Sequence, residues 1–161
     1  KLWDLNLGLP SLEKAPTLIA SNFFLHWLDK PSIKLNQWFN YLAPEGWLAI
    51  AVPLEGSFPE WKEASKNSDL KFSAFKFPSQ KSILECLPEK KLKFQKVFLF
   101  QQEEKDAISL LRPIIEIGAH ASNNKKLSIG ELRRLIQSWP DSKFNNKVTL
   151  TWSVLILLAK K

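Results

Sequence analysis

Few side chains of this 161-residue sequence have a type and a position that could do chemistry. The sequence contains two histidines, His26 and His120, and three arginines against twenty lysines. A histidine can act as a general base near neutral pH, and an arginine can hold a carboxylate through two parallel hydrogen bonds. Because arginine is rare here, Arg112 is a candidate carboxylate-binding residue. It could equally form an i, i+4 ion pair with Glu116 on a helix.

Composition excludes several other kinds of site. The single cysteine, Cys86, rules out a disulfide or a thiolate metal cluster within these residues. No two of the five glycines lie within four residues of each other, so there is no G-x-G-x-x-G motif and no P-loop. There is no uncharged apolar run of about 18 residues, and the first residues do not resemble a signal peptide. We therefore expect a soluble, cytoplasmic protein.

The net charge of +7 is unevenly distributed along the chain. Residues 1–60 carry a net charge of −2, and residues 61–161 carry +9. A basic C-terminal part favours an acidic partner or substrate, although solubility alone would explain it as well. The sequence shows no nucleic-acid-binding motif, so we do not expect a nucleic-acid partner.

The candidate residues must be positioned by strands and helices. Residues 17–20 are β-prone and end at the polar pair Ser21-Asn22, which predicts a strand with a polar tip. Residues 47–52 are continuously apolar, which is typical of a strand buried on both faces in a helix-covered sheet. Two further strands are predicted over residues 93–101 and 147–159.

Helices are predicted between these strands. Apolar spacing and an initial Pro31 favour a helix over 32–42. Ser128, followed by Glu131, forms a capping box for a helix that reaches about Trp139. Further helices are predicted over residues 59–66, 80–87 (capped by Ser79) and 104–116, the last kinked or ended by Pro113. Alternating strands and helices indicate an α/β sheet.

Several segments, taken in order, resemble a known family. They are DLNLGLP (4–10), SNFFLHWL (21–28), GWLAIAVPLEGSFPEW (46–61), FPSQKSILECL (77–87), LLRPIIEIGAH (110–120) and LSIGELRRLIQSWP (127–140). The series resembles the C-terminal two-thirds of class I methyltransferases that use S-adenosylmethionine (SAM). It is most similar to the malonyl-acyl-carrier-protein O-methyltransferases of biotin synthesis, mainly through the stretch from Arg112 to Trp139. Other carboxyl methyltransferases share the earlier segments.

The resemblance implies part of a seven-stranded, Rossmann-like α/β sheet with helices on both faces. This chain would carry the fourth to seventh strands, the last of them antiparallel, over residues 17–21, 47–53, 93–101 and 147–159. The family's first three strands would be missing, together with the glycine-rich loop that holds SAM. We therefore expect a fragment that is inactive by itself.

The expected organisation is a single partial methyltransferase domain over residues 1–161. Its sheet core would comprise residues 1–66, 93–103 and 147–161. Residues 104–146 would form a lid-like helical insertion.

The resemblance assigns five residues to the methyl donor SAM: Asp4, Leu5, Ser21, Asn22 and Phe23. Asp4 matches an acid that accepts a hydrogen bond from the adenine amine, and Leu5 would contact the adenine ring. The other three would lie beside the methyl group. From the residues alone, Asp4 is equally consistent with a surface loop, and Asn22 could cap the following turn.

The resemblance assigns the acceptor side to His26, Ser57, Phe58, Arg112 and Gly118. Arg112 would orient the free carboxylate of a malonyl group. His26 is expected to pack or to position substrate, because an ionised carboxylate needs no base. Ser57 and Phe58 would lie at the active-site rim with Glu60, which could equally be a first-turn carboxylate favoured by the helix dipole. Gly118 would lie in the lid, as would His120.

The leading hypothesis is methyl transfer from SAM to the free carboxylate of malonyl-acyl carrier protein. The acidic carrier protein would dock on the basic residues Lys125, Lys126, Arg133 and Arg134, which could also be merely solvated. One alternative is a methyltransferase for another small carboxylic acid. Another is a non-catalytic interaction module that pairs with a separate subunit, or self-associates, through an exposed strand edge.

Overall fold

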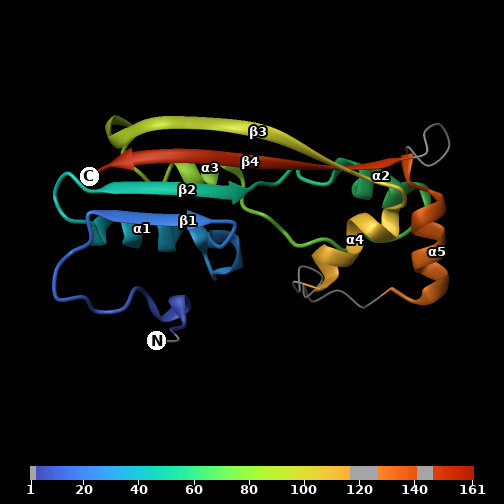
Figure 1. Ribbon diagram of the computed structural model, residues 1–161, viewed down its shortest axis with the longest axis horizontal. Helices are drawn as coiled ribbons and strands as arrows, with labels where there is room; N and C mark the ends of the chain where they lie inside the picture. Colours follow the sequence, from blue (N-terminus) through green and yellow to red (C-terminus); the bar gives the residue numbers. More distant parts are fainter. Residues whose placement is uncertain (1–2, 117–126, 141–146) are drawn as a thin grey trace. The chain divides into compact units, whose positions relative to one another are not determined.

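The computed structural model describes residues 3–116, 127–140 and 147–161 (Figure 1). The contacts within the chain define two compact units. Unit 1 comprises Lys1–Glu55, Phe77–Phe98 and Ser153–Lys161, and unit 2 comprises Gly56–Lys76 and Leu99–Trp152. The expected lid-like segment, 104–146, falls within unit 2, which also takes in residues 56–76. No helix in the described ranges is long and apolar enough to cross a membrane.

Four strands form one sheet in the order β1-β2-β4-β3. They are β1 (Leu18–Asn22), β2 (Trp47–Pro53), β3 (Leu92–Glu104) and β4 (Val148–Lys160). β1 is parallel to β2, with Ser21 opposite Ile50, and β2 is antiparallel to β4, with Ile50 opposite Leu157. The four predicted strands are confirmed to within three residues at each end, and so is the antiparallel direction of the last one.

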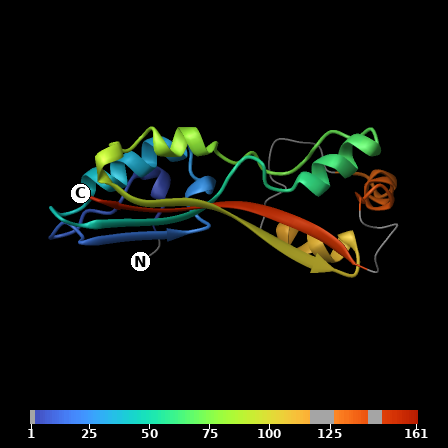
Figure 2. The ribbon, with the colours of Figure 1, turned by 90° about the horizontal axis from the view of Figure 1, so that it is seen from above.

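In unit 1, the helices α1 (Pro31–Tyr41) and α3 (Gln80–Leu84) lie on the same face of the sheet (Figure 2). Alternate residues of β2, Leu48, Ile50 and Val52, point to this face and are buried with Leu35, Trp38 and Phe39 of α1. The intervening residue Trp47 is 40% exposed, and Ala49 and Ala51 are half-buried. The expectation that residues 47–52 are buried on both faces is therefore wrong for the described part of the chain, because both helices lie on one side.

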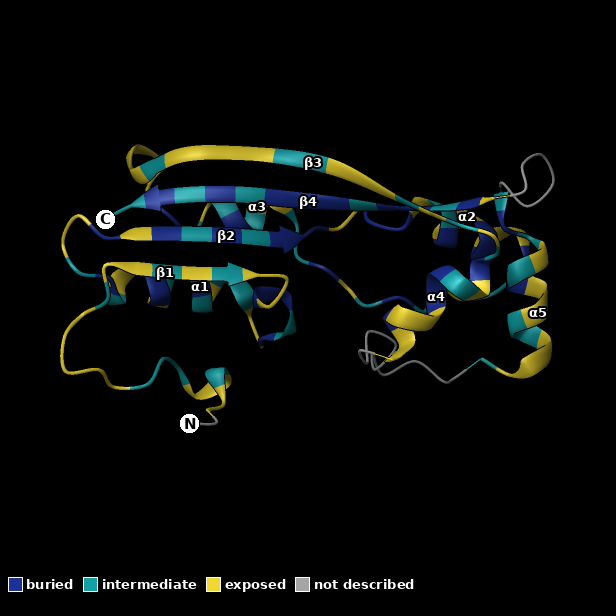
Figure 3. Ribbon diagram, viewed as in Figure 1, coloured by how far each residue is buried: buried dark blue, intermediate teal, exposed yellow. Residues whose placement is uncertain are grey.

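Burial also distinguishes the two long strands. Figure 3 shows β4 as mostly buried and β3 as mostly exposed. β4 lies inside the sheet between β2 and β3, whereas β3 forms an edge. The central position of β4 explains the continuous apolar run over residues 154–159.

Unit 2 contains α2 (Pro59–Asn67), α4 (Ala107–Glu116) and α5 (Ile129–Gln137), with the end of β3 and the start of β4. The capping box of α5 is confirmed: the Ser128 hydroxyl accepts from the Glu131 N–H, and the Glu131 carboxylate accepts from the Ser128 N–H. After α5, the Trp139 indole donates to the Thr149 carbonyl of β4 at 3.1 Å. Helix α4 continues through Pro113 to Glu116.

Candidate functional site

A hollow of about 270 Å³ lies along β1 in unit 1, and we call it the β1 hollow. Its lining comprises Leu5, Leu9, Ile19, Ala20, Ser21, Asn22, Phe24 and Trp38. Three of the five residues that the resemblance assigns to SAM, namely Leu5, Ser21 and Asn22, therefore meet at one place. They come from two segments separated by the loop and turn that precede β1.

Local geometry explains why these residues lie at the strand end. β1 finishes at Asn22 because Phe23 turns the chain with a φ of 50°, and its N–H donates to the Ala51 carbonyl at 2.9 Å. Leu5 begins the short 3-10 helix η1 (Leu5–Leu7). Trp38 contributes the side of the hollow formed by α1 and is only 2% exposed.

The β1 hollow combines apolar walls with uncharged polar groups. The Ser21 hydroxyl oxygen is buried and has no hydrogen-bond partner among the described residues. The side chain of Asn22 is exposed at the strand tip. None of the lining residues carries a charge. Since a buried hydroxyl normally has a partner, Ser21 is suited to bind a polar atom of a ligand.

Asp4 and Phe23 are not among the residues that line the β1 hollow. The Asp4 carboxylate accepts from the Asn6 N–H at 2.9 Å and so caps η1. Phe23 is 38% exposed after the end of β1. The assignment of these two residues to SAM remains a prediction.

His26 is buried beside aromatic rings. It lies in the 3-10 helix η2 (Leu25–Trp27), with its ring centroid 4.9 Å from that of Trp27 and 5.2 Å from that of Phe77. Burial lowers the pKa of His26 from 6.5 to about 4. The imidazole is therefore neutral at physiological pH, and it packs against both aromatic rings.

Ser57 and Phe58 are buried in unit 2. Phe58 precedes α2 with a φ of 66°, and its ring lies 4.5 Å from that of Trp152, centroid to centroid. These positions fit packing around the start of α2, and a role in binding substrate stays a prediction. Gly118, His120, Lys125 and Lys126 lie outside the described residues.

Arg112 lies at a second hollow, of about 280 Å³, in unit 2. We call it the α4 hollow, and its lining comprises Ile108, Leu111, Arg112, Ile115 and Glu116 of α4 and Leu132 of α5. No ion pair joins Arg112 to Glu116 in the structure, since Lys81–Glu85, Lys147–Glu103 and Lys160–Glu45 are the ion pairs within the described ranges. The exposed guanidinium thus lies next to apolar side chains without a charged partner there.

The sequence analysis missed five lining residues of the β1 hollow, namely Leu9, Ile19, Ala20, Phe24 and Trp38. Trp38 lies on the apolar face of the predicted helix 32–42, and it is buried in the structure. Which hollow it would line depends on where the segment 5–9 passes over α1. No local pattern in the sequence indicates that path.

The fold is similar to solved structures, although no protein-family model and no curated protein matches the sequence. One is a protein from Bacillus halodurans described as a "putative methyltransferase", with a TM-score of 0.53 and 15% identity over 97% of this chain and 74% of that one. Another is the YcgJ protein from Bacillus subtilis, with a TM-score of 0.56 and 9% identity over 97% of this chain and 68% of that one. At 15% and 9% sequence identity, the similarity shows that the fold is shared and nothing further. The chain thus has part of the Rossmann-like α/β fold found in class I methyltransferases, as the sequence resemblance implies.

Proposed function

We propose that the chain is part of a SAM-dependent methyltransferase and that the β1 hollow receives part of the SAM molecule. The observation that carries this proposal is the meeting of Leu5, Ser21 and Asn22 around one hollow. Small-molecule pockets usually measure roughly 300–1,000 Å³. A hollow of about 270 Å³ suits a portion of the cofactor, such as its nucleoside, rather than the whole.

The lining residues would make different kinds of contact with the bound molecule. Leu5 and Ile19 offer apolar surface to a flat ring, and the buried Ser21 hydroxyl would gain the partner that it lacks. The Asn22 amide can donate or accept at the strand tip. When bound, SAM supplies an electrophilic methyl group on a sulfonium centre. The 161 residues contain no G-x-G-x-x-G loop, so binding to this part alone is expected to be weak.

On the acceptor side, we propose that Arg112 orients the free carboxylate of a malonyl thioester carried by acyl carrier protein. Its guanidinium has no ion pair with Glu116 and lies beside apolar residues, which would reduce hydration of the bound carboxylate. Methyl transfer would form a bond from the carboxylate oxygen to the methyl carbon as the sulfonium C–S bond breaks and S-adenosylhomocysteine leaves, and Arg112 would contribute the orientation of the carboxylate. The exposed Arg133 and Arg134 on α5 could attract the acidic carrier protein. Another small carboxylic acid would be recognised by the same contacts.

A second candidate function is pairing with another polypeptide through β1. This strand forms one edge of the sheet, and Leu18 in it is 58% exposed. Uncharged edge strands readily accept another strand. Sedimentation velocity would test this: self-association that Leu18→Lys abolishes supports it, and a monomer at every concentration argues against self-pairing.

The donor site is tested by titrating the 15N-labelled 161-residue chain with S-adenosylhomocysteine, the product of methyl transfer. We expect saturable NMR shifts of the amides of Leu5, Ser21 and Asn22. Ser21→Val, which fills the hollow and removes the hydroxyl, should weaken binding about tenfold or more. Thr149→Val, a matched change on the part of β4 in unit 2, should have no effect. Absence of shifts at these three residues at millimolar ligand would refute the proposal.

The acceptor site needs a separate titration. The probe is malonyl-N-acetylcysteamine, which carries a free carboxylate, and its methyl ester is the uncharged control. We expect shifts around Leu111 and Leu132 with the acid only, lost in Arg112→Gln and retained in Arg133→Gln. Equal binding of acid and ester would overturn the assignment of Arg112 without affecting the donor site.

A further inference from the structure

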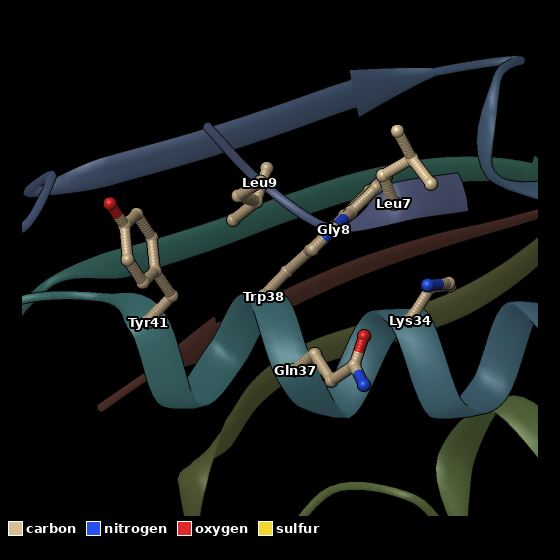
Figure 4. Close-up of a pocket in the computed structure, with 7 residues that line it drawn as sticks. All are labelled: Leu7, Gly8, Leu9, Lys34, Gln37, Trp38 and Tyr41. Carbon is tan, nitrogen blue, oxygen red and sulfur yellow. The ribbon is translucent and has the colours of Figure 1, made fainter. Parts of the chain in front are cut away.

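Unit 1 has another hollow, of about 270 Å³, between the segment Leu7–Leu9 and helix α1 (Figure 4). We call it the α1 hollow. The helix contributes Lys34, Gln37, Trp38 and Tyr41. Their spacing of i, i+3, i+4 and i+7 places all four on one face of the helix. Figure 4 shows Trp38 and Tyr41 rising from α1 toward the segment that crosses above them.

The crossing segment is attached to α1 at two points, one on each side of the hollow. At one side, the Lys34 ammonium donates to the Asn6 carbonyl at 2.7 Å. At the other, the Tyr41 hydroxyl donates to the Pro10 carbonyl and accepts from the Leu12 N–H, both at 3.0 Å. Lys34 and Tyr41 are seven positions apart, which corresponds to roughly 10 Å along the helix.

The chain between these attachments does not fill the space beneath it. Leu7 is 80% exposed, and Gly8 has no side chain and turns the backbone with a φ of 104°. Only Leu9 contributes a half-buried apolar side chain from above. The space is thus maintained by the two attachments and left open by the residues between them.

The lining is rich in donors and carries one positive charge. Lys34 has a neutral carbonyl as its partner, and no acidic side chain lines the hollow or pairs with Lys34 among the residues described. The Trp38 indole nitrogen is buried without a hydrogen-bond partner in the described structure, in a residue that is 2% exposed. Indole N–H is a donor only, so it can be satisfied only by an acceptor. Gln37 adds an exposed amide.

We propose that the α1 hollow binds a small monocarboxylate with a short apolar tail. Its oxygens would accept from Lys34 and from the Trp38 or Gln37 N–H groups, and its tail would lie against Leu9. One lysine balances one negative charge, whereas a phosphate dianion would call for a second cation, and the hollow has none. Nothing in this site depends on the cofactor proposal, although the α1 and β1 hollows share Leu9 and Trp38.

The test is an NMR titration of the full 161-residue chain with isovalerate, following the indole N–H resonances. The Trp38 resonance is identified by its loss in Trp38→Phe. We expect it to shift saturably, together with the Leu9 and Gln37 amides, at millimolar concentrations. Isovaleramide, the neutral analogue, should bind at least about tenfold more weakly, and so should inorganic phosphate. Equal binding of the amide would overturn the role of charge, and tighter binding of phosphate would overturn the ligand class.

Two variants distinguish a loss of ligand contacts from a loss of the hydrogen bonds that attach the segment Leu7–Leu9 to α1. Lys34→Met removes the charge and the attachment to Asn6, and should weaken isovalerate binding about tenfold or more. Gln37→Leu leaves both attachments intact and should weaken it severalfold. Lys62→Met, an exposed lysine of α2 in unit 2, is the matched control and should bind as the unaltered chain does. Unchanged affinity in Lys34→Met and Gln37→Leu would refute the site.

The β1 hollow and the α1 hollow can also be distinguished by the effect of one substitution on the binding of the two ligands. Ser21→Val should weaken binding of S-adenosylhomocysteine and leave isovalerate binding intact. If Ser21→Val abolishes isovalerate binding as well, the carboxylate lies in the β1 hollow, and the proposal of a separate site is wrong.

Discussion

The Glu60 carboxylate accepts two hydrogen bonds from Thr151, one from its backbone N–H at 2.9 Å and one from its hydroxyl. Ninety-one positions separate the two residues, Glu60 in the first turn of α2 and Thr151 in β4. The Phe58 N–H donates to the Thr151 carbonyl at 2.7 Å. Thr151 is 7% exposed. The hydrogen bonds of the buried Thr151 therefore attach the start of α2 to β4.

Removing the Glu60 carboxylate should destabilise unit 2. Glu60→Ala leaves the Thr151 N–H and hydroxyl without their acceptor, which costs about 1–3 kcal/mol for a buried donor. Urea unfolding and hydrogen exchange of the α2 amides would measure the effect. Glu63→Ala, an exposed carboxylate on the same helix, should change stability by less than about 0.5 kcal/mol. Equal losses in both variants would show that the attachment contributes nothing specific.

Features that depend on neighbours in sequence were predictable. The apolar run at 47–52 and the capping box at Ser128 are local patterns, and both elements form. Helix α3 ends at Leu84 rather than at residue 87. The predicted end at residue 87 is wrong, because the chain leaves the helix at Glu85, whose N–H still donates to the Lys81 carbonyl. A proline such as Pro88 prevents a helix from continuing, but it does not determine at which earlier residue the helix ends.

The candidate sites were only partly predictable. Ser21 and Asn22 were identifiable because a strand end is visible in sequence, whereas Trp38 lines two hollows only because the segment 5–9 crosses α1. The attachment of Glu60 to Thr151 likewise joins distant positions. A single amino-acid sequence contains no local pattern that predicts contacts between residues so far apart in the chain.

His26 should make stability depend on pH. Burial lowers its pKa from 6.5 to about 4 in the folded chain. Between those values the unfolded chain binds a proton that the folded chain does not, so stability is full above pH 6.5 and falls as the pH drops to about 4. At about 1.4 kcal/mol per pKa unit, the loss is up to about 3 kcal/mol.

The contribution of His26 is the difference between pH profiles of the unaltered chain and His26→Gln, each measured by urea unfolding from pH 8 to 4. Carboxylates that titrate in the same range affect both profiles and cancel. We expect the two curves to converge toward low pH as the histidine loses its advantage. Parallel curves would contradict the lowered pKa.

Cys86 should be a poor nucleophile while the chain is folded. Burial raises the pKa of its thiol to about 11, and its sulfur donates to the Ile83 carbonyl at 3.0 Å. At pH 8 such a thiol is about 0.1% thiolate, whereas an unperturbed one is roughly a quarter ionised. Reaction with a disulfide reagent should be about 100-fold slower in buffer than in concentrated urea. Similar rates in both would mean that the thiol is not protected by the fold.

Lys161 should stabilise the C-terminal end of α1. Its ammonium donates to the carbonyls of Asn40 and Leu42, which lie at the end of the helix where carbonyls lack intrahelical partners. A positive charge there also interacts favourably with the helix dipole.

Lys161→Met keeps the apolar stem and removes the charge, so we expect the free energy of unfolding to fall by about 1 kcal/mol. Lys90→Met, an exposed lysine of unit 1 in the 3-10 helix η3 (Glu89–Lys91), is the control. The loss should shrink in high salt, because the dipole interaction is screened while the apolar contacts are not. A loss that salt leaves unchanged would assign the effect of Lys161 to its hydrogen bonds rather than to the helix dipole.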